Sequence, residues 1–320
     1  MTLRQGDLTV AKAHRPAAQP GQPFPPAFTH SRSDGLTVAR WLAGPIECGQ
    51  WAGPTLRCSW DSMTELSAIS LPAGELGNRF QKIRDDLRKT GFALADGGVM
   101  RPLLAEAGLH DWDGFAQSWN DLGPDVYMAD GGRYRKRRHG VFAASTHGIS
   151  RQPAQPHYQS RDYNPLNGGV QRWFAPIVTD DSEGSALYAI LRLCRDMFAA
   201  LGAGDDCLPA WHVEVHQFRI EAQAGQPGLP TPEGMHRDGV DWVLVLLIGR
   251  QNVASGETRI ADLPGNPLGS FTLSQPMDAA WVDDNRVTHG VTAIEPLDPS
   301  LPAYRDVLVV TFRNARAPNL

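Results

Sequence analysis

The chain has 320 residues, of which 42% are hydrophobic and 20% are charged, and its formal net charge is −5. This length and apolar content allow one large domain or two small ones with a sizeable core, and they argue against wholesale disorder. The acidic balance argues against a nucleic-acid-binding protein.

The apolar stretches and the cysteines of the sequence predict the cellular compartment of the protein. The longest clean apolar stretch, residues 242–248, is far shorter than the roughly 18–20 residues of a membrane span, and no secretory signal pattern opens the chain. The cysteines Cys48, Cys58, Cys194 and Cys207 are widely spaced and form no CxxC pair, so a zinc knuckle is unsupported. We therefore expect a cytoplasmic protein with free thiols, no membrane contact and no nucleic-acid partner.

The first half of the chain is predicted to be mainly helical. Residues 1–70 are rich in Pro, Ala and Gln, which predicts a partly irregular N-terminal extension ahead of a domain over residues 71–320. Apolar residues recur at spacings of four and three over residues 76–90, which predicts an amphipathic helix. A short strand is expected over 91–96, and further helices over 101–107, 112–122 and 185–201.

A basic run from Arg133 to Arg138 follows an Asp-Gly-Gly turn signal. In a strand, Arg133, Arg135 and Arg137 would share one face. One interpretation is a solvated basic edge strand. The other is that one or two of these arginines point into a cavity and bind a substrate carboxylate, which a guanidinium fork matches. Nucleic-acid binding is the least favoured interpretation.

The segment from residue 157 to residue 177 is rich in turn formers and aromatic residues. It could form a loop over a pocket, with Tyr163 and Asn164 as polar contacts, or it could be only a structured connection. From Trp211 onward the pattern becomes strand-like, with many short strands separated by Gly/Pro turns and no intervening helices. This pattern predicts an antiparallel sandwich or jelly roll, and an α+β protein as a whole.

The clearest chemical signal is a His-x-Asp pair beside an apolar strand. His236 and Asp238 are two residues apart, so in a strand both side chains leave the same face, and His289 follows in another strand-like segment. Two histidines and one carboxylate form the facial triad of non-haem Fe(II) oxygenases, which leaves other metal positions open. The alternative is a hydrogen-bonded loop pair and an ordinary half-buried histidine.

A late strand adds a second signal, because Arg305, Val307, Val309, Thr311 and Arg313 share one of its faces. Two arginines and a threonine on an inward face are costly unless they bind an anion. A dicarboxylate co-substrate would explain them, with Arg305 as the first choice for its distal carboxylate and Thr311 and Arg313 as supports. Alternatively, Arg313 lies in solvent at the strand end.

These residues belong to longer strings that resemble a known family. The strings are PEGMHRDGVDWVLVLLIGRQNVASGETRI, DDNRVTHGVTAI and RDVLVVTFR, with DVYMADGGRYRKRR and NPLNGGVQRWFAPI upstream. They resemble the 2-oxoglutarate–Fe(II) dioxygenases that include bacterial L-isoleucine 4-hydroxylase. The resemblance covers roughly residues 75–315, and the first ~70 residues have no counterpart in it.

The resemblance implies a double-stranded β-helix, a jelly-roll or cupin-like core, with flanking helices mostly from the N-terminal half. It implies Fe(II) held by His236, Asp238 and His289, with 2-oxoglutarate as co-substrate and O₂ as oxidant. An arginine on the last core strand, Arg305 or Arg313, would hold the 2-oxoglutarate carboxylate. Gln217 and Arg219, or His216, on the strand before the His-x-Asp pair are further candidates. No catalytic residue beyond the metal ligands is required.

The reaction implied is oxidative decarboxylation of 2-oxoglutarate coupled to hydroxylation of an unactivated C–H bond, and a free amino acid is the substrate the family suggests. Candidates for its carboxylate are Arg133, Arg135, Arg137 and Arg172, and candidates for its amine are Glu214, Asp241 and Asp130. Trp242 either walls the pocket or belongs to the core. The rival hypotheses are a cupin-like metal-dependent isomerase or hydrolase and a non-catalytic module that binds a small acid.

Overall fold

The structure is a computed structural model, and it describes residues 73–178, 185–202 and 210–315. The extension predicted over residues 1–70 lies outside the described residues, as do Cys48, Cys58 and Cys207. Cys194 is buried and free. No described helix is long and apolar enough to cross a membrane.

The helices of the described chain agree closely with the predicted ones. They are α1 (Ala73–Thr90), α2 (Gly97–Glu106), α3 (Trp112–Gln117), the 3₁₀ helix η1 (Ser118–Asp121) and α4 (Ala186–Leu201). Helix α2 begins four residues earlier than expected, because the Asp96 side chain caps it by accepting a hydrogen bond from Val99 N at 2.9 Å. The helix predicted over 112–122 is α3 followed by η1.

Thirteen strands are formed by the described residues. They are β1 (Phe92–Ala95), β2 (Gly123–Pro124), β3 (Arg135–Ser145), β4 (Gly148–Arg151), β5 (Trp211–Ala222), β6 (Trp242–Gln251), β7 (Val253–Ser255), β8 (Thr258–Asp262), β9 (Pro267–Phe271), β10 (Ala279–Asp283), β11 (Val287–Val291), β12 (Ile294–Pro296) and β13 (Ala303–Asn314). Their pairing between named strands is antiparallel throughout.

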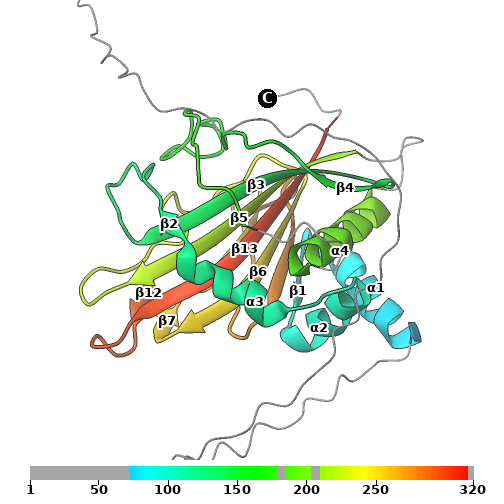
Figure 1. The fold of residues 1–320 in the computed structure, drawn as a ribbon, viewed down its shortest axis with the longest axis horizontal. Coiled ribbons are helices and arrows are strands. Elements are labelled where there is room, and N and C mark those ends of the chain that lie inside the picture. The colour runs from blue at the N-terminus through cyan, green and yellow to red at the C-terminus, as the bar shows by residue number, and fades with distance from the viewer. Residues whose placement is uncertain (1–72, 179–184, 203–209, 316–320) are drawn as a thin grey trace, which may run out of the picture. The chain divides into compact units, whose positions relative to one another are not determined.

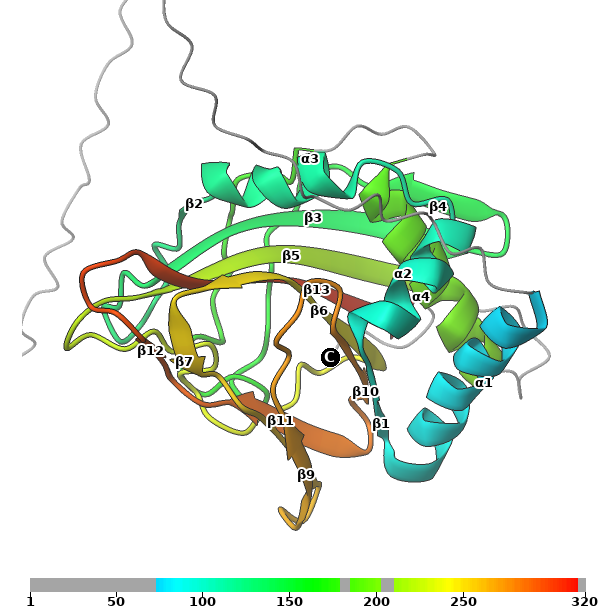
Figure 2. The same ribbon diagram turned by 90° about the horizontal axis from the view of Figure 1, so that it is seen from below.

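The strands form one large sheet and two small ones (Figure 1). The large sheet has the order β1-β10-β6-β13-β5-β3-β2, with β4 also paired to β3, and the small sheets have the orders β11-β8-β9 and β12-β7. Figure 2 shows α3 over one face of the large sheet, while β9 and β11 lie on its other side. This is the α+β fold with a jelly-roll core that the sequence led us to expect.

The first half of the chain contributes more strand than predicted, since β1 to β4 all join the large sheet. Strand β3 pairs with β5 on one side and with β2 and β4 on the other. It is therefore not an edge strand, and the interpretation of the basic run as a solvated edge is wrong. Its residues Arg135 and Arg137 are buried, while Arg133 lies before the strand and is exposed.

The side-chain alternation of the long strands divides the interior into two layers. The outer face of the large sheet packs on the helices, with Val213 and Val215 of β5 and Phe312 of β13 in that core. Trp242 also faces this layer, where its ring stacks on Phe198 with centroids 5.4 Å apart. Trp242 is thus a core residue and does not wall a pocket. The inner face, which points toward the small sheet, carries the polar residues described next.

Candidate metal centre and adjoining pocket

Two histidines from distant parts of the chain meet through their backbones. His236 lies in the connection between β5 and β6, and His289 lies in β11. The N–H of each residue donates to the carbonyl of the other at 2.9 Å, and the two imidazole centroids are 4.5 Å apart. This bridge brings together residues that lie 53 positions apart in the sequence.

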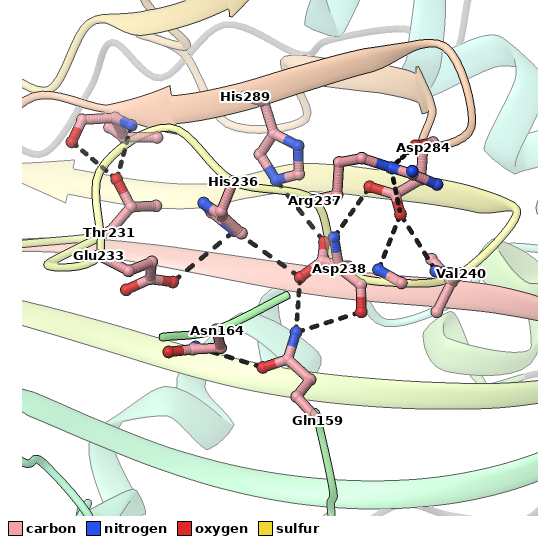
Figure 3. Close-up of polar contacts among 12 residues, drawn as sticks. Gln159, Asn164, Thr231, Glu233, His236, Arg237, Asp238, Val240, Asp284 and His289 are labelled. Atoms are coloured by element: carbon pink, nitrogen blue, oxygen red, sulfur yellow. Dashed lines mark hydrogen bonds and ion pairs between the residues drawn. The ribbon is translucent and has the colours of Figure 1, made fainter. Parts of the chain in front are cut away.

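Asp238 completes the cluster (Figure 3). His236 Nε2 lies 3.8 Å from Oδ1 of Asp238, and His289 Nε2 lies 3.6 Å from its Oδ2. One donor atom from each of the three residues lies within 4.8 Å of the others. His236 Nδ1 donates to the carbonyl of Gly234 at 3.0 Å, so the lone pair of the neutral ring is on Nε2 and faces the carboxylate. Geometry and tautomer therefore fit a divalent metal.

Burial governs the protonation of this cluster. Burial raises the pKa of Asp238 and lowers the pKa of His289 to about 3. Burial also acts to lower the pKa of His236, but the charges of Asp238 and Glu233 outweigh it, so this pKa is raised. A bound cation would take the place of the proton on His236 and would offset the cost of burying the Asp238 charge.

Two residues that sequence reasoning missed hold the Asp238 segment in place. The fully buried Asp284 accepts hydrogen bonds from the backbone N–H groups of Asp238, Gly239 and Val240. The Gln159 side chain donates to Oδ1 of Asp238 at 3.3 Å and to its carbonyl at 3.2 Å. Both are distant in sequence and carry no local signal, so only the tertiary structure reveals them.

Arg305 has the property expected of an anion-binding arginine. It is 2% exposed, and its Nε and Nη2 have no hydrogen-bond partner among the described residues. Burial and the neighbouring guanidinium of Arg250 lower its pKa to about 10. Arg250 is engaged by the carbonyls of Leu273, Val253 and Ser255. A buried guanidinium with free donors beside a second cation fits the distal carboxylate of 2-oxoglutarate.

Thr311 and Arg313 lie elsewhere on β13. They share a face with Arg305, but at about 3.3 Å per residue Thr311 is about 20 Å along the strand from it. Both line the pocket described below. They cannot hold the carboxylate that Arg305 would bind, so their predicted role as its supports is wrong. The alternative that Arg313 lies free in solvent is also wrong, since it is half-buried.

Gln217 and Arg219 lie on the outer face of β5, away from the metal cluster. Gln217 Nε2 donates to Ser118 Oγ of η1 at 2.9 Å, and Arg219 forms an ion pair with Asp306 at 2.7 Å. Their predicted role in co-substrate binding is therefore wrong. His216, the alternative, points inward and lines the pocket.

A cavity of about 830 Å³, counting its open mouth, adjoins Asp238. Besides Asp238 itself, its polar lining includes the cations Arg137 and Arg313, the anion Glu214 and the hydroxyl-bearing Tyr163. Arg135 is not free for a ligand, because it pairs with buried Asp125 at 2.8 Å.

The other candidates for substrate contacts are held by protein partners. Asn164 donates to Gln159, and Arg172 also donates to Gln159 at 3.2 Å. Asp130 accepts from the Tyr134 hydroxyl, and Asp241 accepts from Asn314 N and from the Asn285 side chain.

Comparisons with known proteins agree with this geometry. A family model described as 2OG-Fe dioxygenase matches residues 116–311. The crystal structure of a bsmA homolog from Methylobium petroleophilum is 38% identical, with a TM-score of 0.66, covering 75% of this chain and 96% of that one. The structure of IDO from Bacillus thuringiensis shares the fold at 19% identity, with a TM-score of 0.59, over 74% and 100% of the two chains.

One curated relative is the 3(1)-hydroxy-L-isoleucine 4-dioxygenase of Pantoea ananatis. It is 26% identical over 163 residues, which are 49% of this chain. The match spans 64% of the relative, so it covers less than two thirds of that protein's length.

Proposed function

Starting from the fact that this chain belongs to the 2OG-Fe dioxygenase family, we propose that it is an Fe(II)- and 2-oxoglutarate-dependent hydroxylase. The reaction consumes one substrate C–H bond, 2-oxoglutarate and O₂, and it yields the alcohol, succinate and CO₂. One oxygen atom of O₂ enters the alcohol and the other enters succinate.

The convergence of His236, Asp238 and His289 carries this proposal. Three protein donors would hold Fe(II) and leave open positions for the co-substrate and O₂. Bound iron would supply the redox chemistry that couples decarboxylation to C–H hydroxylation. Asp284 and Gln159 would keep the Asp238 carboxylate oriented toward the two imidazoles, since they fix its backbone and one of its oxygens.

Arg305 would bind the distal carboxylate of 2-oxoglutarate. Its unpartnered Nε and Nη2 offer two parallel donors, the arrangement that a carboxylate accepts in a bidentate pair. Burial removes competing water and strengthens this contact.

We further propose a free amino acid as the substrate. The cavity beside Asp238 offers cations, Arg137 and Arg313, for a carboxylate, and Glu214 for an ammonium group. Hydrogen bonds from His139 and His157 keep the pKa of Glu214 well below its usual range despite burial, so it is ionised at neutral pH. The printed name of the Pantoea ananatis relative, a hydroxy-L-isoleucine dioxygenase, supports this class of substrate.

The test is an assay of substrate-stimulated succinate formation. Purified protein would be supplied with Fe(II), ascorbate and 2-oxoglutarate, with and without a panel of free amino acids. We expect succinate to rise with at least one amino acid, with a matching product heavier by one oxygen atom. The Asp238→Ala variant, which loses one ligand and the carboxylate charge, should form no succinate above background.

This assay separates the rival hypotheses. A cupin-like isomerase or hydrolase would convert its substrate without consuming 2-oxoglutarate, and a non-catalytic binding module would consume neither. Absence of succinate under every condition, with iron shown to be bound, would contradict the dioxygenase proposal. Succinate formation that no amino acid stimulates would contradict only the substrate class.

A further inference from the structure

A second cluster of metal-binding residue types, distinct from the His236 cluster, has three of its four members in the pocket lining. It comprises His139 on β3, His157 in the segment that follows β4, and Glu214 and His216 on β5. One donor atom from each of these residues lies within 4.8 Å of the others. The proposed hydroxylation chemistry gives this cluster no role beyond the charge of Glu214.

The strand register explains how this cluster forms. His139 and His216 are direct partners in the β3–β5 pairing, and Glu214 precedes His216 by two residues on the same face of β5. His157 is held opposite by backbone hydrogen bonds with Arg172 at 2.9 Å in both directions. Glu214 Oε2 lies 2.5 Å from His157 Nδ1, 3.1 Å from His139 Nε2 and 3.6 Å from His216 Nε2.

Arg137 decides the tautomer of His216. Its Nη2 lies 2.7 Å from His216 Nδ1, and its guanidinium is sandwiched between the rings of Phe174 at 3.8 Å and Phe218 at 4.5 Å. A guanidinium only donates hydrogen bonds, so His216 Nδ1 must accept. The proton of the neutral His216 ring is therefore on Nε2, the nitrogen that faces Glu214. His216 therefore presents an N–H to the carboxylate and cannot offer a lone pair there.

His139 and His157 are not restricted in this way. Their nitrogens that face Glu214 are Nε2 and Nδ1, respectively. In the described part of the chain, no hydrogen bond holds the opposite nitrogen of either ring. Each ring can therefore carry its proton on the far nitrogen and direct a lone pair toward the place that Glu214 occupies. Burial lowers the pKa of His157 to about 4, so this ring is neutral at physiological pH, as a metal ligand must be.

We propose that His139 Nε2, His157 Nδ1 and Glu214 Oε2 form a second divalent-metal site, separate from the His236, Asp238 and His289 cluster. Two imidazoles and one carboxylate suit Zn²⁺, Co²⁺ or Ni²⁺, and three protein ligands leave a position open toward the cavity. Asp125 lies 3.6 Å from Arg137 and offsets the charge of that guanidinium, which reduces its repulsion of the ion. His216 stays outside the ligand set, with the N–H of its Nε2 3.6 Å from Glu214 Oε2.

A filled second site would change access to the pocket, and this consequence rests on the proposed function. The ion and a substrate ammonium group would compete for Glu214, so the ion would act as a competitor of the amino acid and not of 2-oxoglutarate. The second metal site itself does not depend on the proposed function, because it requires only the donor atoms of His139, His157 and Glu214.

The test counts bound metal in the full-length chain. Each variant would be equilibrated with Zn²⁺, freed of unbound ion by gel filtration and analysed for zinc by atomic emission. We expect the wild type to bind two ions, Asp238→Ala to bind one, and Asp238→Ala combined with Glu214→Gln to bind none. In the Asp238→Ala background, Co²⁺ should give d–d absorption bands that Glu214→Gln abolishes.

The matched control is His216→Asn in the Asp238→Ala background. This variant should keep its ion, because the tautomer argument places His216 outside the ligand set. Loss of the ion in this variant, with His139→Asn retaining it, would overturn the ligand assignment. An Asp238→Ala protein that binds no zinc would overturn the site, and would show that the cluster is only a hydrogen-bond network around Glu214. Circular dichroism and a zinc-dependent rise in the unfolding temperature of each variant distinguish lost binding from lost folding.

Discussion

Asp284 holds Asp238 through the backbone. Its Oδ1 accepts from Asp238 N at 2.9 Å, and its Oδ2 accepts from the next two N–H groups at 2.8 and 3.1 Å. The Asp284 side chain is fully buried, so these three donors replace the water that its carboxylate has lost. The position of the candidate iron-binding carboxylate is therefore set by a second carboxylate 46 residues away in the chain.

We expect Asp284→Asn to weaken Fe(II) binding and turnover by about 10- to 100-fold, the usual effect of removing an outer-shell partner of a metal ligand. An asparagine keeps one acceptor oxygen but turns an NH₂ group toward backbone donors. Fe(II) affinity by competition with a chelating dye, and succinate formation at saturating iron, would measure the two effects. Asp283→Asn is the matched control, since that carboxylate accepts from Asn285 N and not from the Asp238 segment. Equal losses of Fe(II) affinity and turnover in both variants would contradict the role of Asp284 in positioning Asp238.

Arg305 and Arg313 should affect different ligands. We expect Arg305→Gln to raise the KM for 2-oxoglutarate by at least about tenfold, because a charge-assisted bidentate contact is lost. Arg313→Gln, at the other end of β13, should leave this KM unchanged and raise the KM for the amino-acid substrate. Initial rates with each ligand varied in turn would measure the split. The opposite pattern would transfer the co-substrate role to Arg313.

Gln217→Leu tests the strand register directly. The Gln217 side chain is fully buried on the outer face of β5, its Oε1 has no partner among the described residues, and its Nε2 contacts Ser118. Replacement by leucine removes one hydrogen bond and one unsatisfied acceptor, so we expect stability to change by less than about 1 kcal/mol. The KM for 2-oxoglutarate should not change. A marked rise would show that Gln217 contacts the co-substrate.

Asp125 should stabilise the fold through the buried arginines of β3. Burial acts to raise the pKa of Asp125, but the charges of Arg135 and Arg137 outweigh this effect, so the pKa lies below the usual 3.8 of an aspartate. A depressed carboxyl pKa stabilises the folded state above the unfolded pKa and loses that contribution as the pH falls through the folded value. Asp125→Asn leaves two buried guanidiniums without this partner and should cost about 3–5 kcal/mol near pH 7.

This prediction is tested by measuring how the stability lost in Asp125→Asn depends on pH. The difference in unfolding free energy between wild type and Asp125→Asn, from urea titrations, should be constant from pH 8 to pH 5 and should shrink below pH 3.8. Glu221→Gln is the control, because the Lys136–Glu221 pair is about one-third exposed and should contribute less than about 1 kcal/mol. If the difference in unfolding free energy grew toward low pH, the pKa of Asp125 would be raised in the folded state and not lowered.

Local patterns in the sequence determined the elements and the ligand types. The period of α4 follows from apolar residues such as Leu187, Ile190 and Cys194, all of which are buried. The two-residue spacing of His236 and Asp238 limits them to one face of an extended segment. Candidate ligand sets could be proposed from such short-range rules because neighbouring residues constrain each other sterically.

Only the tertiary structure decided which face of each strand points inward. Alternation shows that Gln217 and Arg219 share a face, but a shift of one residue exchanges that face for the one bearing His216. The buried position of Arg137, the pairing of His139 with His216, and the contact of Asp284 with Asp238 also depend on strand register and packing. These contacts join distant segments whose alignment is set by the whole core, so no local pattern in the sequence encodes them.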